Sequence, residues 1–290
     1  MQGRVIKQIS NRYTVLLDDQ QIKTCIARGK LRLGISPVVG DFVDVQKFDD
    51  KYGIEKVYQR TNYLQRPPIA NVDQAIVVMS AVNPPFSPIL VDQLIFLISC
   101  ENIEPIILVT KMDLVKADDV IFDYIADYRH GGYQVIISGK DTNDLPALEI
   151  LLKDKISVLT GQSGVGKSSF LNRLDPSFKL VTQEISHALG RGKHTTRNSE
   201  LYAIAGGWIA DTPGFSKLDF SMITKERLAA SLKDFNDYHG KCRFRDCLHD
   251  KEPGCAVKEA VDQKMISASR YQHYIECLQY IEEGRKTNYD

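Results

Sequence analysis

One eight-residue segment constrains the fold of this chain more than any other feature. Residues 161–168 read Gly-Gln-Ser-Gly-Val-Gly-Lys-Ser, which is the G-x-x-x-x-G-K-[ST] spacing of a phosphate-binding P-loop. Glycines let the backbone wrap a phosphate chain, and the following helix directs its positive end at the same anion. An apolar run at 156–160 precedes the segment and a helical pattern follows it. The sequence therefore predicts the strand, turn and helix of an α/β nucleotide-binding core.

The P-loop predicts a role for its polar side chains. Lys167 is expected to reach the β- and γ-phosphates and to act in catalysis, and the Ser168 hydroxyl is expected to ligate Mg²⁺. Backbone N–H groups would hold the phosphate oxygens. The predicted phosphate-binding residues are Gly161, Gln162, Ser163, Gly164, Val165, Gly166, Lys167, Ser168 and Ser169.

A base-reading motif comes before the P-loop along the chain. Thr110, Lys111, Met112 and Asp113 follow the apolar run 106–109 and match the Lys and Asp of the Asn-Lys-x-Asp pattern. The Asp113 carboxylate can accept from N1–H and the exocyclic amine of guanine together, a paired edge that adenine lacks. Lys111 is expected to lie along the base plane. Thr110 replaces the usual Asn, so an amide that bridges base and P-loop is lost and weaker base binding is expected.

The order of the motifs is as informative as their content. Ser138, Gly139 and Lys140 end the next predicted strand, where backbone N–H groups would meet guanine O6. GTPases usually place both base-reading segments after the P-loop, whereas here both come before it. The sequence therefore predicts a circularly permuted P-loop GTPase core that binds GTP and GDP with Mg²⁺.

Two segments after the P-loop complete the predicted site. Asp211 would hold Mg²⁺ through water, and the N–H of Gly214 would sense the γ-phosphate. Between the P-loop and Asp211, the run 190–197 is glycine-rich and basic. It contains Thr195 and Thr196, one of which should complete the Mg²⁺ coordination; Thr195 and Thr196 both remain open for that role.

The residue after Gly214 predicts slow hydrolysis. Phe215 stands where Ras-like enzymes place a Gln that orients water, and an apolar side chain cannot do this. His194 is the candidate catalytic group, because a neutral imidazole can orient the attacking water. The alternative is that His194 is only a polar loop residue.

Patterning divides the chain into three predicted domains. Residues 1–66 alternate as short strands separated by turn residues, which indicates an all-β barrel of the OB-fold type. This segment holds twelve Lys or Arg and seven Asp or Glu, a net charge of +5, with Arg28, Lys30 and Arg32 in one loop. That excess favours a polyanionic partner, and an exposed basic loop without a ligand is the alternative.

Residues 67–222 alternate between strands and helices, which predicts a mainly parallel sheet. Residues 223–290 read as mainly helical around a Cys/His-rich loop. The expected strands are 74–81, 105–109, 134–138, 156–160, 200–204 and 208–210, and the expected helices are 89–100, 118–130, 144–152 and 167–174.

Four metal-ligand types crowd into the last domain. The spacing Cys-x4-Cys-x-His-x5-Cys supplies three thiolates and one imidazole, a set that suits tetrahedral Zn²⁺ with every position filled and hence a structural metal. The predicted zinc ligands are Cys242, Cys247, His249 and Cys255. The remaining cysteines, Cys25, Cys100 and Cys277, are expected to pack as small buried side chains.

Composition excludes several classes of protein. The chain has 290 residues, of which 43% are hydrophobic and 26% charged, so a disordered chain is excluded. No N-terminal signal and no apolar run long enough to span a bilayer is present in the sequence. A cytoplasmic protein without a membrane partner is therefore expected, and six unevenly spaced cysteines fit a reducing compartment.

The motifs in this order resemble the bacterial ribosome small-subunit-dependent GTPases, the RsgA (YjeQ/YloQ) family. Besides the motifs above, the shared features include the run 66–73, Arg-Pro-Pro-Ile-Ala-Asn-Val-Asp. The resemblance covers nearly the whole chain, and Thr110 is its main departure. It implies a GTP hydrolase that binds the small ribosomal subunit and its rRNA late in assembly. Subunit-stimulated hydrolysis would act as a maturation checkpoint and release the protein, which is expected to be a monomer; other assembly factors are further candidate partners.

Two other classes of function stay open on the residues alone. One is a nucleic-acid-binding module whose pocket senses GTP without turnover, which would keep RNA binding when Lys167 is removed. The other is an ATP-dependent P-loop enzyme, and Asp113 argues against it because its paired acceptor matches guanine.

Overall fold

The computed structural model describes residues 1–28, 35–65, 68–140, 142–176, 198–210, 220 and 222–286. The chain forms two compact units, each assembled from segments that are separated in sequence. The first unit takes its described residues from Met1–Gln74, Leu145–Leu159 and Lys167–Phe215. The second takes them from Ala75–Asp144, Thr160–Gly166 and Ser216–Asp290. The division into domains at residues 66 and 222 stays a prediction.

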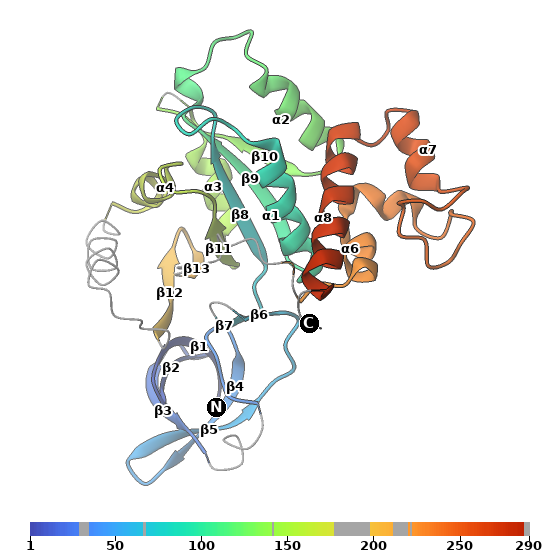
Figure 1. The fold of residues 1–290 in the computed structure, drawn as a ribbon. Helices are drawn as coiled ribbons and strands as arrows, with labels where there is room; N and C mark the ends of the chain where they lie inside the picture. Colours follow the sequence, from blue (N-terminus) through green and yellow to red (C-terminus); the bar gives the residue numbers. More distant parts are fainter. Residues whose placement is uncertain are drawn as a thin grey trace. The chain divides into compact units, whose positions relative to one another are not determined.

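The N-terminal strands of the first unit close into a five-stranded barrel (Figure 1). Its strands are β1 (Gln2–Ile9), β2 (Arg12–Leu17), β3 (Ile22–Ala27), β4 (Phe42–Phe48) and β5 (Lys51–Val57). They pair in the order β1-β2-β3-β5-β4, and β1 also pairs with β4, which closes the barrel in the OB-fold order. Val5, Val15 and Val43 point inward and are fully buried, as the alternating sequence pattern predicts. The predicted all-β barrel is confirmed.

Besides β2, strand β1 pairs with two further strands, and a bulge lies between the two pairing regions. Its first half pairs with β4, while Lys7, Gln8 and Ile9 pair with β12 (Asn198–Ile204). The register against β2 shifts between Val5 and Lys7, and such a bulge bends a strand. The pairing with β12 joins the barrel to the rest of the first unit. The remaining described elements of this unit are α3 (Leu145–Leu152), β11 (Ile156–Thr160), α4 (Lys167–Leu174), β13 (Gly207–Ala210) and the hairpin β6 (Tyr63–Gln65) with β7 (Pro68–Ala70).

Two polar side chains fasten the end of the barrel segment to α3 and β11. The buried Gln74 amide donates to the carbonyl oxygen of Leu151 and to the Ser157 hydroxyl, both at 2.9 Å. The Asp73 carboxylate accepts from the N–H of Ile156 at 2.7 Å. A buried amide must find hydrogen-bond partners, so these bonds fix the position of Gln74 relative to α3 and β11.

The second unit combines a parallel sheet with helices from both ends of its sequence. The sheet elements run in the order β10 (Gln134–Ile137), β9 (Glu104–Thr110) and β8 (Gln74–Ser80). Every residue of β8 is buried, as expected for a strand covered on both faces. The helices are α1 (Pro88–Cys100), α2 (Ile121–His130), α6 (Lys225–Ser231), α7 (Ala256–Asp262) and α8 (Ala268–Lys286), with 3₁₀ turns η2 (Met112–Leu114) and η3 (Lys233–Tyr238).

The predicted elements of residues 67–222 are confirmed closely. Each expected strand corresponds to one of β8 to β13, and each expected helix to one of α1 to α4, with ends that differ by a few residues. Helix α2 begins at Ile121 and not at 118, because residues 117–120 form turns. Among the residues that the structure describes, no helix is long and apolar enough to cross a membrane.

A buried arginine holds the C-terminal helix against the rest of the second unit. Helices α1 and α8 lie side by side (Figure 1). Arg270 of α8 is 4% exposed and pairs with Asp92 of α1 at 3.3 Å and Asp127 of α2 at 2.8 Å. It also pairs with Asp234 of η3. One guanidinium thus joins four elements, because its planar fork can donate in several directions at once.

A histidine completes this cluster. His273 Nδ1 lies 2.6 Å from the second carboxylate oxygen of Asp92. That hydrogen bond and the Asp92 charge raise the pKa of His273, against the lowering effect of burial. Three carboxylates surround a single arginine here, so a protonated imidazole reduces the excess of negative charge.

We therefore expect the stability of the second unit to depend on pH through His273. Its pKa is higher in the folded than in the unfolded chain, so the stabilisation is complete below about pH 6.5 and is lost as pH rises through the folded pKa. The free-energy difference between wild type and His273→Gln, measured by urea unfolding from pH 5.5 to 8.5, should shrink with rising pH. The same difference for the exposed His130→Gln is the control, and equal pH profiles for the two variants would contradict the expectation.

Candidate nucleotide and metal sites

The two predicted base-reading segments meet at the ends of neighbouring parallel strands. β9 ends at Thr110 and β10 ends at Ile137. The N–H of Met112 donates to the carbonyl of Ser138 at 3.1 Å, and the N–H of Lys140 donates to the Asp113 carboxylate at 3.2 Å. The carboxyl ends of parallel strands lie at one sheet edge, where α/β folds bind ligands. Sequence segments 27 residues apart are thereby joined into one edge.

Gly139 is required for this approach. A Cβ atom built on Gly139 would lie 2.9 Å from the N atom of Asp113 and 3.0 Å from its carboxylate oxygen. Any larger residue would push the two segments apart. The N–H of Gly139 meets the Thr142 hydroxyl at 2.7 Å, so this loop is also fixed from its other side.

Thr110 connects the base-reading motif to the P-loop. Its hydroxyl is buried and donates to the carbonyl of Val165 at 2.5 Å, and the carbonyl of Met79 lies 3.3 Å away. A threonine at this position therefore retains the link to the P-loop that the sequence pattern predicts to be lost with the Asn amide. The contact to the base stays a prediction.

Lys111 makes a second link of the same kind. Its backbone is left-handed, with φ of 59°, which turns the ammonium group toward the P-loop. The Nζ atom donates to the carbonyl of Gly164 at 2.9 Å and to the carbonyl of Asn83. Asn83 lies in the turn that follows β8. The ends of β8, β9 and β10 therefore all contribute to one edge.

Glycines set the path of the P-loop backbone. Gly161, Gly164 and Gly166 all have positive φ angles, a conformation that glycine adopts at little cost. At Gly161 a Cβ would lie 2.1 Å from the carbonyl oxygen of Val78, so only glycine fits. The predicted strand, turn and helix are present, because β11 ends at Thr160 and α4 begins at Lys167.

The polar side chains of the P-loop differ in exposure. Lys167 is half-buried, and this burial lowers its pKa, while Gln162, Ser163, Ser168 and Ser169 are exposed. Several predicted site residues lie outside the described residues. These are His194, Thr195, Thr196, Asp211, Gly214 and Phe215.

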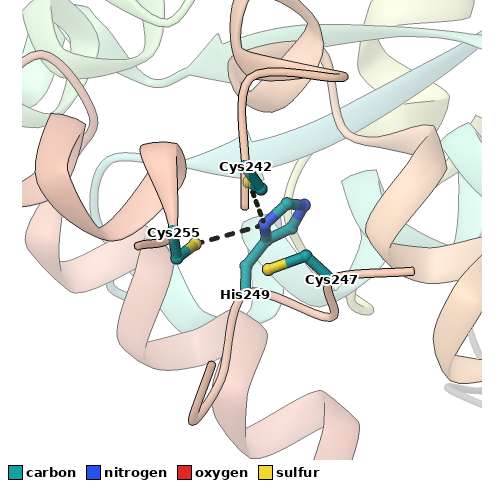
Figure 2. A group of neighbouring side chains, drawn as sticks. All are labelled: Cys242, Cys247, His249 and Cys255. Atoms are coloured by element: carbon teal, nitrogen blue, oxygen red, sulfur yellow. Dashed lines mark hydrogen bonds between the residues drawn. The ribbon is translucent and has the colours of Figure 1, made fainter. Parts of the chain in front are cut away.

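The predicted zinc ligands are brought together within one loop region. Figure 2 shows the side chains of Cys242, Cys247, His249 and Cys255 directed at a common point. Their ligand atoms all lie within 4.8 Å of one another. His249 Nδ1 is 3.6 Å from the sulfur of Cys242 and 3.4 Å from that of Cys255.

These distances fit tetrahedral zinc. Zn–S bonds of about 2.3 Å and Zn–N bonds of about 2.0 Å, at tetrahedral angles, put nitrogen and sulfur about 3.5 Å apart. Burial, together with the neighbouring thiols, raises the pKa of Cys247 to about 12, so a bound cation is needed to hold these cysteines as thiolates. Burial lowers the pKa of His249, which favours the neutral imidazole that metals bind.

Aromatic side chains of α8 and η3 hold the ligand loop in place. The Tyr271 hydroxyl donates to the carbonyl of His249 at 2.7 Å, and the Tyr274 hydroxyl donates to the carbonyl of Leu248 at 2.6 Å. The ring of Phe235 meets the imidazole of His249 edge-on, with centroids 5.4 Å apart. Such outer contacts orient metal ligands. The predicted buried cysteines Cys25, Cys100 and Cys277 are confirmed as buried.

Sequence reasoning missed Asn83 and the buried ion cluster around Arg270. Asn83 lies three residues after the end of β8 and precedes two prolines. This turn signal at the carboxyl end of a parallel strand could have identified it. Arg270 carries no such signal, because its partners are 36 to 178 residues away in the chain.

We expect Thr110→Val to weaken guanine-nucleotide binding. Valine keeps the shape but leaves the buried carbonyl of Val165 without its donor, which corresponds to a rise in the GDP Kd of about three- to tenfold. Fluorescence titration with a labelled GDP measures this. Thr110→Ser keeps the hydroxyl and should bind as wild type, whereas equal affinities for all three proteins would show that the bridge is unimportant.

We expect about one zinc ion per purified chain, held by the cluster in Figure 2. Cys247→Ser should lose most of this zinc and lower the melting temperature, because metal bonds would stabilise a loop that has no helix or strand of its own. Metal analysis and thermal melting provide the measurements. Cys25→Ser in the barrel is the matched control and should keep its zinc; zinc retained by Cys247→Ser would contradict this ligand set.

Known proteins resemble the chain over its whole length. The family model described as RsgA GTPase matches residues 57–221, and the RsgA N-terminal domain model matches residues 2–54. The small ribosomal subunit biogenesis GTPase RsgA 2 of Oceanobacillus iheyensis is 50% identical over 293 residues, which cover 99% of each chain. RsgA of Bacillus subtilis is 46% identical over 297 residues, again 99% of each chain.

Solved structures show the same fold. The crystal structure of YloQ, titled a circularly permuted GTPase, superposes with a TM-score of 0.82 at 40% identity, and covers 97% of this chain and 95% of that one. YjeQ from Thermotoga maritima gives a TM-score of 0.82 at 34% identity, covering 97% and 98%. The predicted fold class is thereby confirmed: a circularly permuted GTPase core with an N-terminal barrel and a C-terminal Cys/His cluster. The chain belongs to the RsgA GTPase family and is a GTP hydrolase.

Proposed function

We propose that this GTPase binds the small ribosomal subunit late in its assembly and hydrolyses GTP to GDP and phosphate when the subunit stimulates it. The observation that carries the proposal is the similarity to proteins named small ribosomal subunit biogenesis GTPases, at 46% to 50% identity over 99% of the chain. The matched residues cover 99% of this chain and 99% of each of those proteins.

Guanine recognition is assigned to the edge formed by β9 and β10. The Asp113 carboxylate is exposed there and offers the paired acceptor that guanine requires. Lys111 and Thr110 would set the position of this edge against the P-loop, since both contact P-loop carbonyls. The nucleotide thus would be read by elements that already contact one another.

Mg²⁺ and the transferred phosphate are assigned to residues on both sides of the P-loop. Ser168, one of Thr195 and Thr196, and Asp211 through water would hold the metal, which neutralises developing charge on the phosphates. Lys167 would reach the β- and γ-phosphates. Burial lowers the pKa of its ammonium, and a bound phosphate would favour the charged form.

The timing of hydrolysis is assigned to the segment around His194. Because Phe215 stands in place of a water-orienting Gln, GTP hydrolysis would stay slow until the docked subunit orders His194 against the attacking water. Loss of the γ-phosphate would then release Gly214 and the threonines. This change is the switch by which the protein would leave the subunit, so that GTP hydrolysis acts as a maturation checkpoint.

Ribosomal RNA is assigned to the barrel and to the zinc segment. Cationic groups lie over aromatic rings on the barrel strands: Arg4 over Phe42 at 4.3 Å and Arg28 over Phe48 at 3.6 Å. Such pairs combine phosphate attraction with a surface on which bases stack. Arg28 also pairs with Glu55 at 2.7 Å. Its two predicted partners, Lys30 and Arg32, lie outside the described residues.

The remaining parts of the proposal concern organisation and setting. A barrel domain (1–66), a GTPase domain (67–222) and a zinc domain (223–290) would act together as a monomer in the cytoplasm. Other ribosome assembly factors are further candidate partners.

GTP turnover, measured alone and with purified small subunits, tests the proposal. We expect slow intrinsic turnover and stimulation of at least about tenfold by small subunits, because a docked partner would supply the order that the isolated site lacks. Large subunits and ATP are the controls. His194→Ala should remove the stimulated rate but leave GDP affinity unchanged.

Turnover that is equal with and without small subunits would reject the subunit-stimulated mechanism. Stimulation that survives in His194→Ala would reject only the assignment of His194. Lys167→Ala separates catalysis from RNA contact, because it should abolish turnover while RNA binding by the barrel persists.

A further inference from the structure

The Cys/His cluster and the base-reading edge are joined within the second unit by a series of side-chain contacts that are linked through helix α8 and the turn after β8. At the metal end, Tyr271 and Tyr274 of α8 hold the carbonyls of His249 and Leu248. Tyr274 is fully buried and meets the ring of Phe96 in α1 edge-on, with centroids 6.5 Å apart. The ligand loop therefore rests directly on α8, and α8 rests on α1.

In the middle of the series, Arg270 joins α8 to helices α1 and α2. Its guanidinium carbon lies 4.5 Å above the ring of Tyr128, and its Nε bonds to Asp92. The Tyr128 hydroxyl donates to the same Asp92 carboxylate at 2.9 Å. Burial and the Asp92 charge raise the pKa of Tyr128 well above its usual value, so it stays a neutral donor. Any movement of α8 must therefore change the surroundings of Tyr128.

At the nucleotide end, Tyr128 contacts the turn after β8. The ring of Phe86 packs edge-on against Tyr128, with centroids 6.3 Å apart, and stacks on Tyr124 at 5.7 Å. Phe86 closes the turn 81–86, because its N–H bonds to the carbonyl of Ala81. The same turn presents the Asn83 carbonyl that holds the ammonium of Lys111. The series thus ends on the motif assigned to guanine.

We propose that Arg270 and Tyr128 are positioning residues that couple zinc binding at the Cys/His cluster to guanine-nucleotide affinity. This inference rests on the two sites assigned under the proposed function. The switching element is the loop that carries the four ligands. It contains only turns and bends between Gly240 and Cys255, so four metal bonds would add to the hydrogen bonds from Tyr271 and Tyr274 that position it.

Zinc would act as follows. A bound metal fixes the carbonyls of Leu248 and His249, and these fix α8 through the two tyrosine hydroxyls. With α8 fixed, Arg270 holds Tyr128 against Phe86, and the turn 81–86 keeps its carbonyl on Lys111. Without zinc the loop loosens and the base-reading edge becomes less well ordered, so nucleotide binding must include the cost of ordering it.

Coupling of this kind is reciprocal, which gives two independent measurements. Removing zinc with a chelator should raise the GDP Kd of the wild type by about five- to tenfold, and saturating GDP should slow zinc release to a colorimetric chelator by a similar factor. The second measurement uses the zinc-loaded folded protein, so it holds even where prolonged chelation unfolds the chain.

Two variants test the path. Tyr128→Phe removes only the hydroxyl that joins α2 to Asp92, and Arg270→Lys keeps the charge but loses the planar fork. Both should retain zinc and reduce the effect of GDP on zinc release toward a factor of one. Arg227→Gln is the matched control. It breaks the exposed Arg227–Glu101 pair between α6 and α1, outside this series, and should keep the full effect.

The outcomes separate this inference from the proposed function. Zinc release that is unchanged by GDP in the wild type, or an undiminished effect in both variants, overturns it. A chain that lacks zinc altogether also overturns it. Neither measurement uses ribosomal subunits. Coupling without subunit-stimulated turnover would therefore support the inference while rejecting the proposed function.

Discussion

The buried guanidinium of Arg270 is the interaction on which the second unit depends. It donates to three carboxylates from three elements that lie far apart in the sequence, and removing one partner of such a buried set costs about 3–5 kcal/mol. Hydrophobic packing of α1 against α8 tolerates small shifts, whereas a planar donor with fixed partners does not. The cluster therefore specifies one position for α8 and for the ligand loop that α8 supports.

At the candidate nucleotide edge, a few side chains also fix the positions of several segments. Three strands end at the same edge of a parallel sheet, and backbone carbonyls of the P-loop are held by side chains of the base-reading motif. At Thr110, a hydroxyl donates to the P-loop carbonyl of Val165, a link that the usual Asn amide would be expected to make. The chemistry required at this position is a buried donor of suitable length, and more than one residue type supplies it.

Much of the fold was predictable from local pattern. The alternation of β1 to β5, the apolar strands β8 to β11 and the helix after the P-loop follow from periodicity and glycine placement. The motif spacings also predicted the P-loop, the base-reading role of Thr110 to Asp113 and the four zinc ligands, and the structure brings those four ligand side chains together. Contacts across long sequence separations were not predictable, since nothing local distinguishes Asp92 or Arg270 from ordinary helix residues. The role of the Asn83 carbonyl was not predictable either, because every residue has a backbone carbonyl and the sequence does not show which one accepts a hydrogen bond.

The sequence by itself determined which chemical groups this protein possesses and in what order: a phosphate-binding turn, a guanine-type acceptor before it and a tetrahedral donor set after it. Motif spacing encodes these because each depends on residues close together in the chain. Only the tertiary structure decided how they are joined. The Thr110 and Lys111 links to the P-loop, the Gly139 contact with Asp113 and the path from Tyr271 through Arg270 to Phe86 all arise from packing between distant segments. Such contacts are set by which elements pack together, and that is a property of the whole fold.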